Sequence, residues 1–462
     1  MPSIRLPLHS YALRSIPAST SRLVNCFIEQ LPPDARSPQI LSRTPGFTLA
    51  TNVGSASVPC YGLHYALDKL FGVYGSNLYS IDSSNVATLV GSVGSATQQS
   101  IDMDHNLTNL VIVNQPNAYY YDGTTLTQIA DADFTARGAG DVEFIDNWMV
   151  FREPDSGRIF GADFGGVSSF DALNYVTAEG SPDDIVGMKA DHRQLILLGE
   201  ESGEIWENTG ISGFPFQRAI NGFFELGCLN GRTICKQDNS VFWLANDYTV
   251  RRLDGITPVR VSTHAIEQRL HDMTLSTAKA YARSYEGHLL YKLTFDEGCF
   301  VYDVTTQLWH EEKSYGYSGS IWRNFAQAFN RDYVGSSIDY RLGIVDPDAY
   351  DEAGSTQIME WTYQPIFTEN RAIHDRLEIT VEVAVGGAVT VVDPQIMLEY
   401  SDDDGRTWTS MPQRSLGLMG QYTHQVEWDR LGSPAKGKGR VYKMSVSDAV
   451  KVNVTDTLLS YR

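Results

Sequence analysis

The residues whose types and spacing best suggest chemistry are Ser401, Asp403, Gly405, Thr407 and Trp408, which match the Asp-box pattern S-x-D-x-G-x-T-W. In such a segment the aspartate accepts hydrogen bonds from backbone N–H groups, the glycine takes a positive φ, and the tryptophan covers the turn. These roles shape a hairpin and make or break no bond. The pattern occurs once, without a recognisable set of arginines and a tyrosine–glutamate nucleophile pair, so we interpret it as a structural turn.

A second candidate is the segment 432–439, GSPAKGKG, which approaches the phosphate-binding pattern G-x-x-x-x-G-K-[ST]. That pattern needs Ser or Thr after its lysine to reach Mg²⁺, and a helix after the loop whose amides face the phosphates. Position 439 is Gly, and a strand is expected at 441–446. We interpret the segment as a flexible hairpin loop whose Lys436, Lys438 and Arg440 could meet an acidic partner.

The segment 102–113 begins like a calcium-binding loop, with Asp102, Asp104 and Asn106 at alternate positions. An EF-hand loop needs Gly at its sixth position and Glu at its twelfth. This chain has Leu107 and Val113 there, so calcium binding is not expected.

The cysteines and histidines form no ligand pattern. The cysteines are odd in number, make no CxxC pair and indicate free thiols of a reducing compartment (Cys26, Cys60, Cys228, Cys235 and Cys299). The ten histidines are scattered without HExxH, and no GxSxG or GxGxxG fingerprint occurs. We predict no catalytic residues, no cofactor, no cofactor-binding residues and no metal site, and assign no partner-binding residues. Glycosidase carboxylates from separate repeats would leave no local motif, so that activity stays open.

Composition and charge restrict the function classes. The chain has 462 residues, 42% of them hydrophobic and 11% aromatic, with 39 glycines, which favours β-structure with many tight turns. With 36 Lys and Arg against 56 Asp and Glu, the net charge is −20. Stable binding to DNA phosphates needs a basic face, and no basic run supplies one. An acidic wall along which DNA slides stays open, beside the simpler interpretation that the acidity confers solubility.

One pattern recurs along the chain: an apolar strand, a polar turn, and a second apolar strand that ends at Asp or Asn. Successive copies lie 40 to 49 residues apart and end at Asp82, Asp122, Asp163, Asn208, Asp254, Asp303 and Asp346. This period, with a strand pair in each unit, is typical of β-propeller blades. The alternative is a large β-sandwich with irregular hairpins, which is less favoured because sandwiches space their turns at about 8–12 residues.

We therefore predict an all-β protein in three parts: an extended N-terminal arm at 1–55, a β-propeller of six or seven blades at 56–350, and a C-terminal β-sandwich-like domain at 351–462. The last part has alternating strands at 377–385, 396–400, 422–428 and 442–446. The one convincing helix, at 264–272, is an insertion between repeats. The apolar stretch 379–392 is too short to span a membrane, and no membrane contact is expected.

Short motifs in a fixed order resemble those of a known family. The N-terminal motifs have the form R-x-V-N, T-P-G-hydrophobic, G-L and L-Y-x-V-D, and they lie at 21–27, 43–47, 61–63 and 78–82. Further matching segments lie at 261–267, 398–408, 414–422 and 428–432. In these segments the chain resembles the packaged-DNA stabilisation proteins of short-tailed bacteriophages (podoviruses), over nearly its whole length.

The resemblance implies a structural virion protein of the phage tail, also called a hub or nozzle, and not an enzyme. Such a protein forms a homo-oligomeric ring, typically a hexamer, below the portal–adaptor complex, after assembly in the host cytoplasm. It closes or extends the DNA channel, stabilises packaged DNA, serves as a conduit in genome ejection and docks a tail fibre, tailspike or tail needle protein. Double-stranded DNA passes through the lumen without specific binding.

Two other classes remain as alternatives. A propeller carbohydrate-active enzyme or lectin with a sialidase-like Asp-box would cluster carboxylates or stack aromatic rings over one propeller mouth. A cellular propeller scaffold would form no ring.

Overall fold

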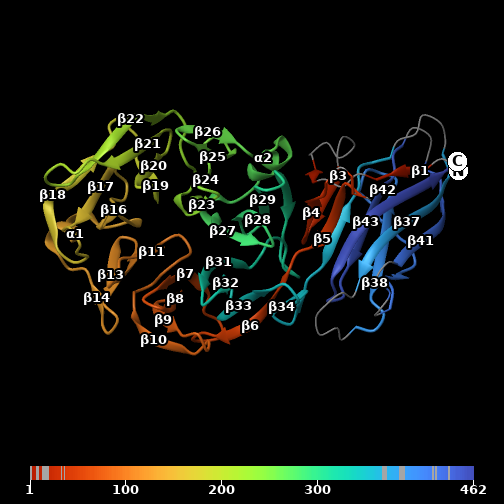
Figure 1. Cartoon of the computed structure of the whole chain (residues 1–462), viewed down its shortest axis with the longest axis horizontal. Helices are drawn as coiled ribbons and strands as arrows, with labels where there is room; N and C mark the ends of the chain where they lie inside the picture. Colours follow the sequence, from red (N-terminus) through yellow and green to blue (C-terminus); the bar gives the residue numbers. More distant parts are fainter. Residues whose placement is uncertain are drawn as a thin grey trace.

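The computed structural model describes residues 3–6, 10–12, 20–32, 34–35, 37–366, 372–383, 391–418, 421, 424–434 and 438–462. Within the continuous stretch 37–366, seven β-sheets are arranged around an axis as the blades of a propeller, and the C-terminal domain lies beside them (Figure 1). The all-β fold with a propeller of six or seven blades is confirmed.

Each blade consists of four antiparallel strands, ordered from the axis outward, and in blades 6 and 7 these strands are part of a larger sheet. The strands are β7 (Cys60–Ala66), β8 (Lys69–Tyr74), β9 (Asn77–Ile81) and β10 (Ala87–Ser92) in blade 1; β11 (Ile101–His105), β12 (Leu110–Asn114), β13 (Asn117–Tyr121) and β14 (Leu126–Gln128) in blade 2; β15 (Val142–Ile145), β16 (Trp148–Arg152), β17 (Arg158–Ala162) and β18 (Phe170–Thr177) in blade 3; β19 (Ile185–Asp191), β20 (Gln194–Gly199), β21 (Gly203–Asn208) and β22 (Phe216–Phe224) in blade 4; β23 (Cys235–Gln237), β24 (Ser240–Leu244), β25 (Val250–Asp254) and β26 (Thr257–Arg260) in blade 5; β27 (Lys279–Tyr285), β28 (His288–Thr294), β29 (Cys299–Asp303) and β30 (Leu308–Glu311) in blade 6; and β31 (Trp322–Ala328), β32 (Arg331–Ser336), β33 (Arg341–Asp346) and β6 (Gly46–Asn52) in blade 7.

The predicted repeat is the middle hairpin of each blade. In blade 2, for example, the two apolar runs are β12 and β13, and they pair only with strands of their own sheet. All five residues of β12 are buried, because its two faces pack against different neighbouring blades. Burial on both faces explains why the middle strands lack strict alternation.

The innermost strands form the wall of the axis. β7, β11, β15, β19, β23, β27 and β31 follow one another as neighbours, and β31 lies beside β7 again. In blades 1, 3, 4, 5, 6 and 7 a two-residue turn with positive φ at both positions joins this strand to the next, as at His192-Arg193 and Phe329-Asn330. Such turns match the twist of a hairpin, and they hold each inner strand against its blade.

An N-terminal strand closes the propeller. β33 pairs antiparallel with β6, from Gly46 opposite Asp346 to Asn52 opposite Arg341. β34 (Asp351–Glu352) and β35 (Ser355–Thr356) extend the same sheet. Blade 7 therefore takes its outermost strand from the opposite end of the propeller sequence.

The C-terminal domain is a sandwich of two sheets around an apolar core. One sheet has the order β4 (Cys26–Gln30), β5 (Gln39–Arg43), β43 (Val452–Tyr461), β37 (His374–Val383), β41 (His424–Gly432), with β1 (Ser3–Arg5) paired to β43. The other contains β3 (Thr20–Val24), β36 (Met359–Thr362), β42 (Val441–Val446), β38 (Gln395–Ser401) and β39 (Thr409–Ser410), with β2 (Tyr11–Ala12) and β40 (Arg414–Ser415) at its margins. Trp361 and Trp428 are fully buried between the sheets.

The N-terminal segment differs from the extended arm that the sequence suggested for 1–55. β3, β4 and β5 belong to the sandwich, and β6 belongs to the propeller. β3, β5 and β6 pair with residues more than 250 positions later in the chain, as Leu23 does with Trp361, and β4 pairs with β5. Local sequence patterns carry no signal of such distant pairing. A segment rich in proline therefore suggests an extended arm when only the sequence is considered.

The predicted helix is present as α2 (His264–Leu270), between blades 5 and 6. A second short helix, α1 (Ala132–Arg137), was not predicted; it precedes blade 3 and is capped by the Asp131 side chain. Short 3₁₀ turns lie at Gly231–Thr233 and Leu275–Thr277. Among the described residues, no helix combines the length and apolarity needed to cross a membrane.

Part of the predicted loop at 432–439, including Lys436, lies outside the described residues, as do Gly386, Gly387 and Tyr422.

Candidate functional site

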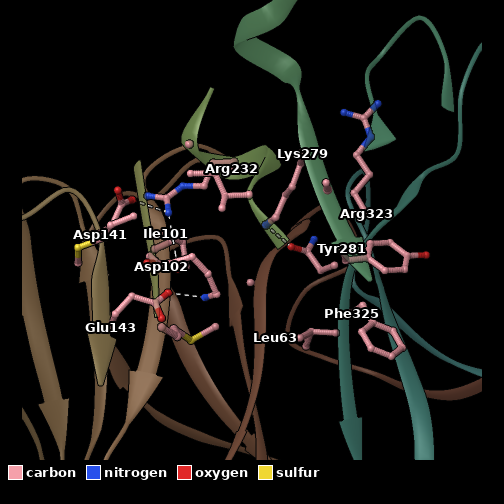
Figure 2. A pocket seen from close by; sticks show the side chains of 18 residues that line it. Leu63, Ile101, Asp102, Asp141, Glu143, Arg232, Lys279, Tyr281, Arg323 and Phe325 are labelled. Carbon is pink, nitrogen blue, oxygen red and sulfur yellow. Dashed lines mark hydrogen bonds and ion pairs between the residues drawn. The ribbon is translucent and has the colours of Figure 1, made fainter. Parts of the chain in front are cut away.

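The axial channel of the propeller is the place where all seven blades bring side chains together (Figure 2). It encloses a cavity of about 150 Å³. Its charged lining consists of Asp102, Asp141, Glu143, Lys189, Arg232, Lys279 and Arg323. Positive and negative groups are therefore mixed along the axis.

Asp141 of blade 3 binds two arginines in this channel, one from its own blade and one from the 3₁₀ turn before blade 5. Its Oδ2 accepts a hydrogen bond from Arg152 Nε at 2.6 Å, and its Oδ1 lies 2.8 Å from Arg232 Nη1. Arg232 also lies 3.6 Å from Asp102 Oδ1 and donates to the backbone oxygens of Gln99 and Gly140. Burial tends to raise the pKa of Asp141, but the two guanidinium groups outweigh burial and lower it.

Lys189 links blade 4 to blade 3 through a direct ion pair with Glu143. The other carboxylate oxygen of Glu143 accepts the backbone N–H of Ala190 at 3.0 Å. Burial alone would lower the pKa of Lys189, whereas Glu143, Asp102 and Asp104 together raise it. The lysine is therefore held in its charged form.

Lys279 links blade 6 to blades 1 and 7. Its Nζ donates to the backbone oxygen of Tyr61 at 2.7 Å, to Gln98 Oε1 at 3.3 Å and to Asn324 Oδ1. Burial lowers its pKa to about 8, a value that would suit a nucleophile or base. All three donor positions of the ammonium are engaged, however, so no lone pair is presented to a substrate.

The charged side chains of the channel thus link different blades through ion pairs and hydrogen bonds. Each carboxylate oxygen of Asp102, Asp141 and Glu143 already faces a donor or a cation. A glycosidase needs one carboxylic acid and one carboxylate free to act on substrate, and this lining offers no such pair. A DNA duplex, whose major groove alone is about 12 Å wide, is also far too large for the cavity.

The Asp-box forms the structural turn that the sequence predicted. Asp403 Oδ1 accepts the backbone N–H groups of Arg406 and Thr407 at 3.1 and 2.8 Å, and Thr407 Oγ1 donates to Oδ2 at 2.6 Å. Gly405 has a φ of +84°. The hydrogen bonds from Thr407 and the neighbouring groups lower the pKa of Asp403. The carboxylate is fully used in shaping the loop between β38 and β39.

The junction between propeller and sandwich contains a second charged group, around the buried carboxylate of Glu311. Arg22 of β3 donates to both carboxylate oxygens of Glu311 of β30, at 3.0 and 2.7 Å, and Arg269 of α2 pairs with the same carboxylate. Asn25 has a φ of 54°; its amide donates to the backbone oxygens of Lys313 and Ile358 and accepts the N–H of Lys313. The outer edge of blade 6 is therefore fastened to the first strands of the chain.

Arg43 fastens the same junction from the other side. Its guanidinium donates to backbone oxygens of four residues from three segments. Tyr350 lies just before β34, Gln357 lies just after β35, and Asp448 and Val450 lie between β42 and β43. The side chain is 4% exposed. Burial lowers its pKa to about 10, still far above neutrality.

A small cluster near the end of the inner strands was missed by the sequence analysis. His64 of β7 lies beside Asp104 and His105 of β11, and suitable ligand atoms of the three side chains lie within 4.8 Å of one another. Asp104 was part of the rejected calcium pattern. The residue that completes the group comes from another blade, which explains why no local motif revealed it.

Two family descriptions match the chain, and together they cover most of it. Residues 19–350 match the β-propeller of bacteriophage P22 Gp10, and residues 361–460 match its β-sandwich. The chain belongs to the bacteriophage P22 Gp10 family. It is a structural protein of the phage virion, from a family that stabilises packaged DNA.

The motifs that suggested this family now have positions in the fold. Arg22 and Asn25, from the R-x-V-N motif, and Arg43, before T-P-G, all lie at the junction between the two Gp10 domains. The contacts of these residues hold the propeller and the sandwich together.

Solved structures with a similar fold share little sequence with this chain. They include a streptogramin B lyase (TM-score 0.45, 9% identity, 64% of this chain and 95% of that one) and the Pan2 WD40 domain of Neurospora crassa (TM-score 0.40, 8% identity, 62% and 89%). PorZ, a surface component of the type-IX secretion system of Porphyromonas gingivalis, is similar with a TM-score of 0.39 and 13% identity, over 78% of this chain and 46% of that one. No curated protein matches the chain in sequence.

Proposed function

We propose that this protein forms a ring, typically a hexamer, in the phage tail below the portal–adaptor complex, where it closes or extends the DNA channel and stabilises the packaged genome. It would also serve as the conduit during ejection and dock a tail fibre, tailspike or tail needle protein. The proposal rests on one observation: the chain carries both Gp10 domains. The axis of its own propeller holds only a small cavity, lined by ion pairs.

Because the axis of a single propeller is closed, the DNA channel of the proposed ring lies between copies. Each copy then acts as a rigid body, because ion pairs and hydrogen bonds between blades join its inner strands. Retention of DNA comes from closure of the ring or from a further plug protein, and not from affinity for phosphates.

The charge of the chain suits such a conduit. Each copy carries −20, and binding to phosphates through released counterions requires a basic surface. In a gel-shift titration at low salt, the assembled protein is expected to leave duplex DNA unshifted at micromolar concentration. Micromolar binding with a steep salt dependence would contradict a sliding surface.

The ring itself is tested by mass. The purified protein is measured alone and after mixing with a portal–adaptor complex, by native mass spectrometry or light scattering. A closed ring, alone or on the complex, is expected. A monomer that leaves the portal–adaptor complex unchanged in mass would contradict the proposal.

Attachment to the adaptor is proposed to use the N-terminal segment and exposed loops. Deletion of residues 1–50 would remove β3, β4, β5 and most of β6 and unfold both domains, so it cannot report on attachment. Deletion of residues 1–19 leaves those strands in place. The deletion removes β1, which pairs with β43, and the buried Leu6, so we expect the shortened protein to fold with a lowered thermal midpoint and to assemble poorly into virions. Normal attachment would contradict the role of this segment.

The alternative of a carbohydrate-active enzyme or lectin finds little support in the lining of the channel and in the Asp-box. We expect no cleavage of sialosides, common polysaccharides or ATP. Turnover that disappears when one carboxylate at a propeller mouth is replaced would favour the enzyme.

A further inference from the structure

The cluster of His64, Asp104 and His105 lies where two neighbouring blades meet. β7 and β11 are adjacent inner strands that are not paired in one sheet. His64 Nε2 and His105 Nδ1 are 2.8 Å apart. Asp104 Oδ1 lies 4.0 Å from His64 Nε2 and 3.7 Å from His105 Nδ1. Two imidazole nitrogens and one carboxylate oxygen therefore converge on one point.

The carboxylate is held in place by the backbone of two strands. The N–H of His105 donates to Asp104 Oδ1 at 2.8 Å, and the N–H of Phe144 on β15 donates to Oδ2 at 2.6 Å. Oδ1 keeps a second lone pair for the rings. Hydrogen bonds that orient a ligand in this way are a regular feature of metal sites.

The cluster is also accessible. The side chains of His64, Asp104 and His105 are 23%, 21% and 41% exposed. The nearby cation, Lys189, is already paired with Glu143. Solvent can therefore reach the open side of the three ligand atoms.

We propose that His64, Asp104 and His105 bind one Zn²⁺ ion, with water in the fourth position. Two imidazoles and a carboxylate are ligands that zinc prefers, whereas calcium and magnesium take oxygen ligands. With bonds of about 2.0–2.1 Å, tetrahedral ligand atoms lie about 3.3 Å apart. The two nitrogens must separate, and the oxygen must approach, by only about half an ångström.

Zinc replaces the hydrogen bond between the two rings. The ring that donates in this bond moves its proton to its other nitrogen, so binding needs no net release of a proton. The ion then links blade 1 to blade 2 near the end of their inner strands. This link goes beyond the proposed role in the tail and does not depend on it.

The test uses the tag-free full chain after treatment with EDTA, titrated with ZnCl₂ by calorimetry. One ion per chain is expected to bind at micromolar or lower concentration and to raise the thermal midpoint, because the ion binds the folded state. Asp104→Asn and His105→Ala should each weaken binding by at least about tenfold. The exposed side chain of His105 makes His105→Ala the safer variant for folding.

His192→Ala is the matched control. His192 is exposed and its Nδ1 lies 2.9 Å from Asp191, which also pairs with Lys236, and among the described residues no third ligand completes a group there. This variant should bind zinc as the parent does. Absence of bound zinc in the parent, or unchanged affinity and thermal shift in both Asp104→Asn and His105→Ala, would overturn the proposal. Bound Co²⁺ should give the intense visible absorption of four-coordinate cobalt in the parent and lose it in His105→Ala.

Discussion

The domain junction and the axial channel both bury arginines, but they neutralise them differently. At the junction Arg43 meets backbone carbonyl oxygens, which carry no net charge. In the channel Arg152 and Arg232 share the carboxylate of Asp141. The buried Arg43 is thus held by neutral acceptors, whereas the two channel arginines are held by a carboxylate.

The difference follows from what each region joins. Arg43 fastens three irregular segments, whose backbone oxygens have no partners in a sheet. The channel joins regular inner strands, whose free backbone N–H groups bond to carboxylates of neighbouring blades, as those of Phe144 and Ala190 do, so acidic side chains are already at hand for the arginines. Gly140 leaves room for the guanidinium of Arg152, because a Cβ at this position would lie 2.1 Å from Arg152 Nη2.

Arg43→Ala should have the largest effect. It leaves up to four buried carbonyl oxygens without a donor and opens a cavity, at a cost of about 4–5 kcal/mol in the free energy of unfolding. Urea denaturation followed by tryptophan fluorescence measures this. Arg43→Lys should recover part of the loss. A loss below about 1 kcal/mol would show that the junction does not depend on this residue.

Asp141→Asn should come next, with a loss of about 3 kcal/mol, because it leaves two buried guanidinium groups without their anion. The matched control is Asp146→Asn, which breaks the exposed pair with Arg193 and should cost at most about 1 kcal/mol. Equal losses in the two variants would remove the distinction between the channel and the surface.

Glu311→Gln tests an ion pair at the junction. Burial would raise the pKa of Glu311, but Arg22 and Arg269 outweigh it and lower the pKa to about 2. Against an unfolded value of about 4.3, this contributes about 2–3 kcal/mol at neutral pH. The contribution is complete above the unfolded value and disappears as the pH falls through about 2. The variant should therefore be less stable at pH 7 and approach the parent near pH 2–3; a constant difference would contradict this.

Asp403→Ala should have the smallest effect on the thermal midpoint. The carboxylate is exposed and orders only the loop between β38 and β39. The variant should keep the oligomeric state and the far-ultraviolet circular dichroism of the parent. A collapse of the fold would assign the turn a larger role than its exposure suggests.

The sequence predicts the parts of this fold whose interactions are local. The middle hairpins stand out because both faces of β12 or β24 are buried, and four of the five residues in each strand are apolar. The inner strands are harder to see, because their turns use pairs such as His192-Arg193 and Phe329-Asn330, which lack the usual Asn-Gly signal. The joining of β6 to β33 and the meeting of His64 with Asp104 depend on distant segments, which no local pattern encodes.

Closure of blade 7 by β6 also determines when the propeller can finish folding. Gly46 leaves the ribosome early, but its partner Asp346 does not yet exist. At a synthesis rate of about 5–20 residues per second, β6 waits about 15–60 s for β33. During that interval blades 1 to 6 can stack, but the first and last faces of the series stay uncovered. A nascent chain that stops before Arg341 therefore exposes two unpaired apolar faces, and the propeller becomes protected from aggregation and proteolysis only in the last quarter of its synthesis.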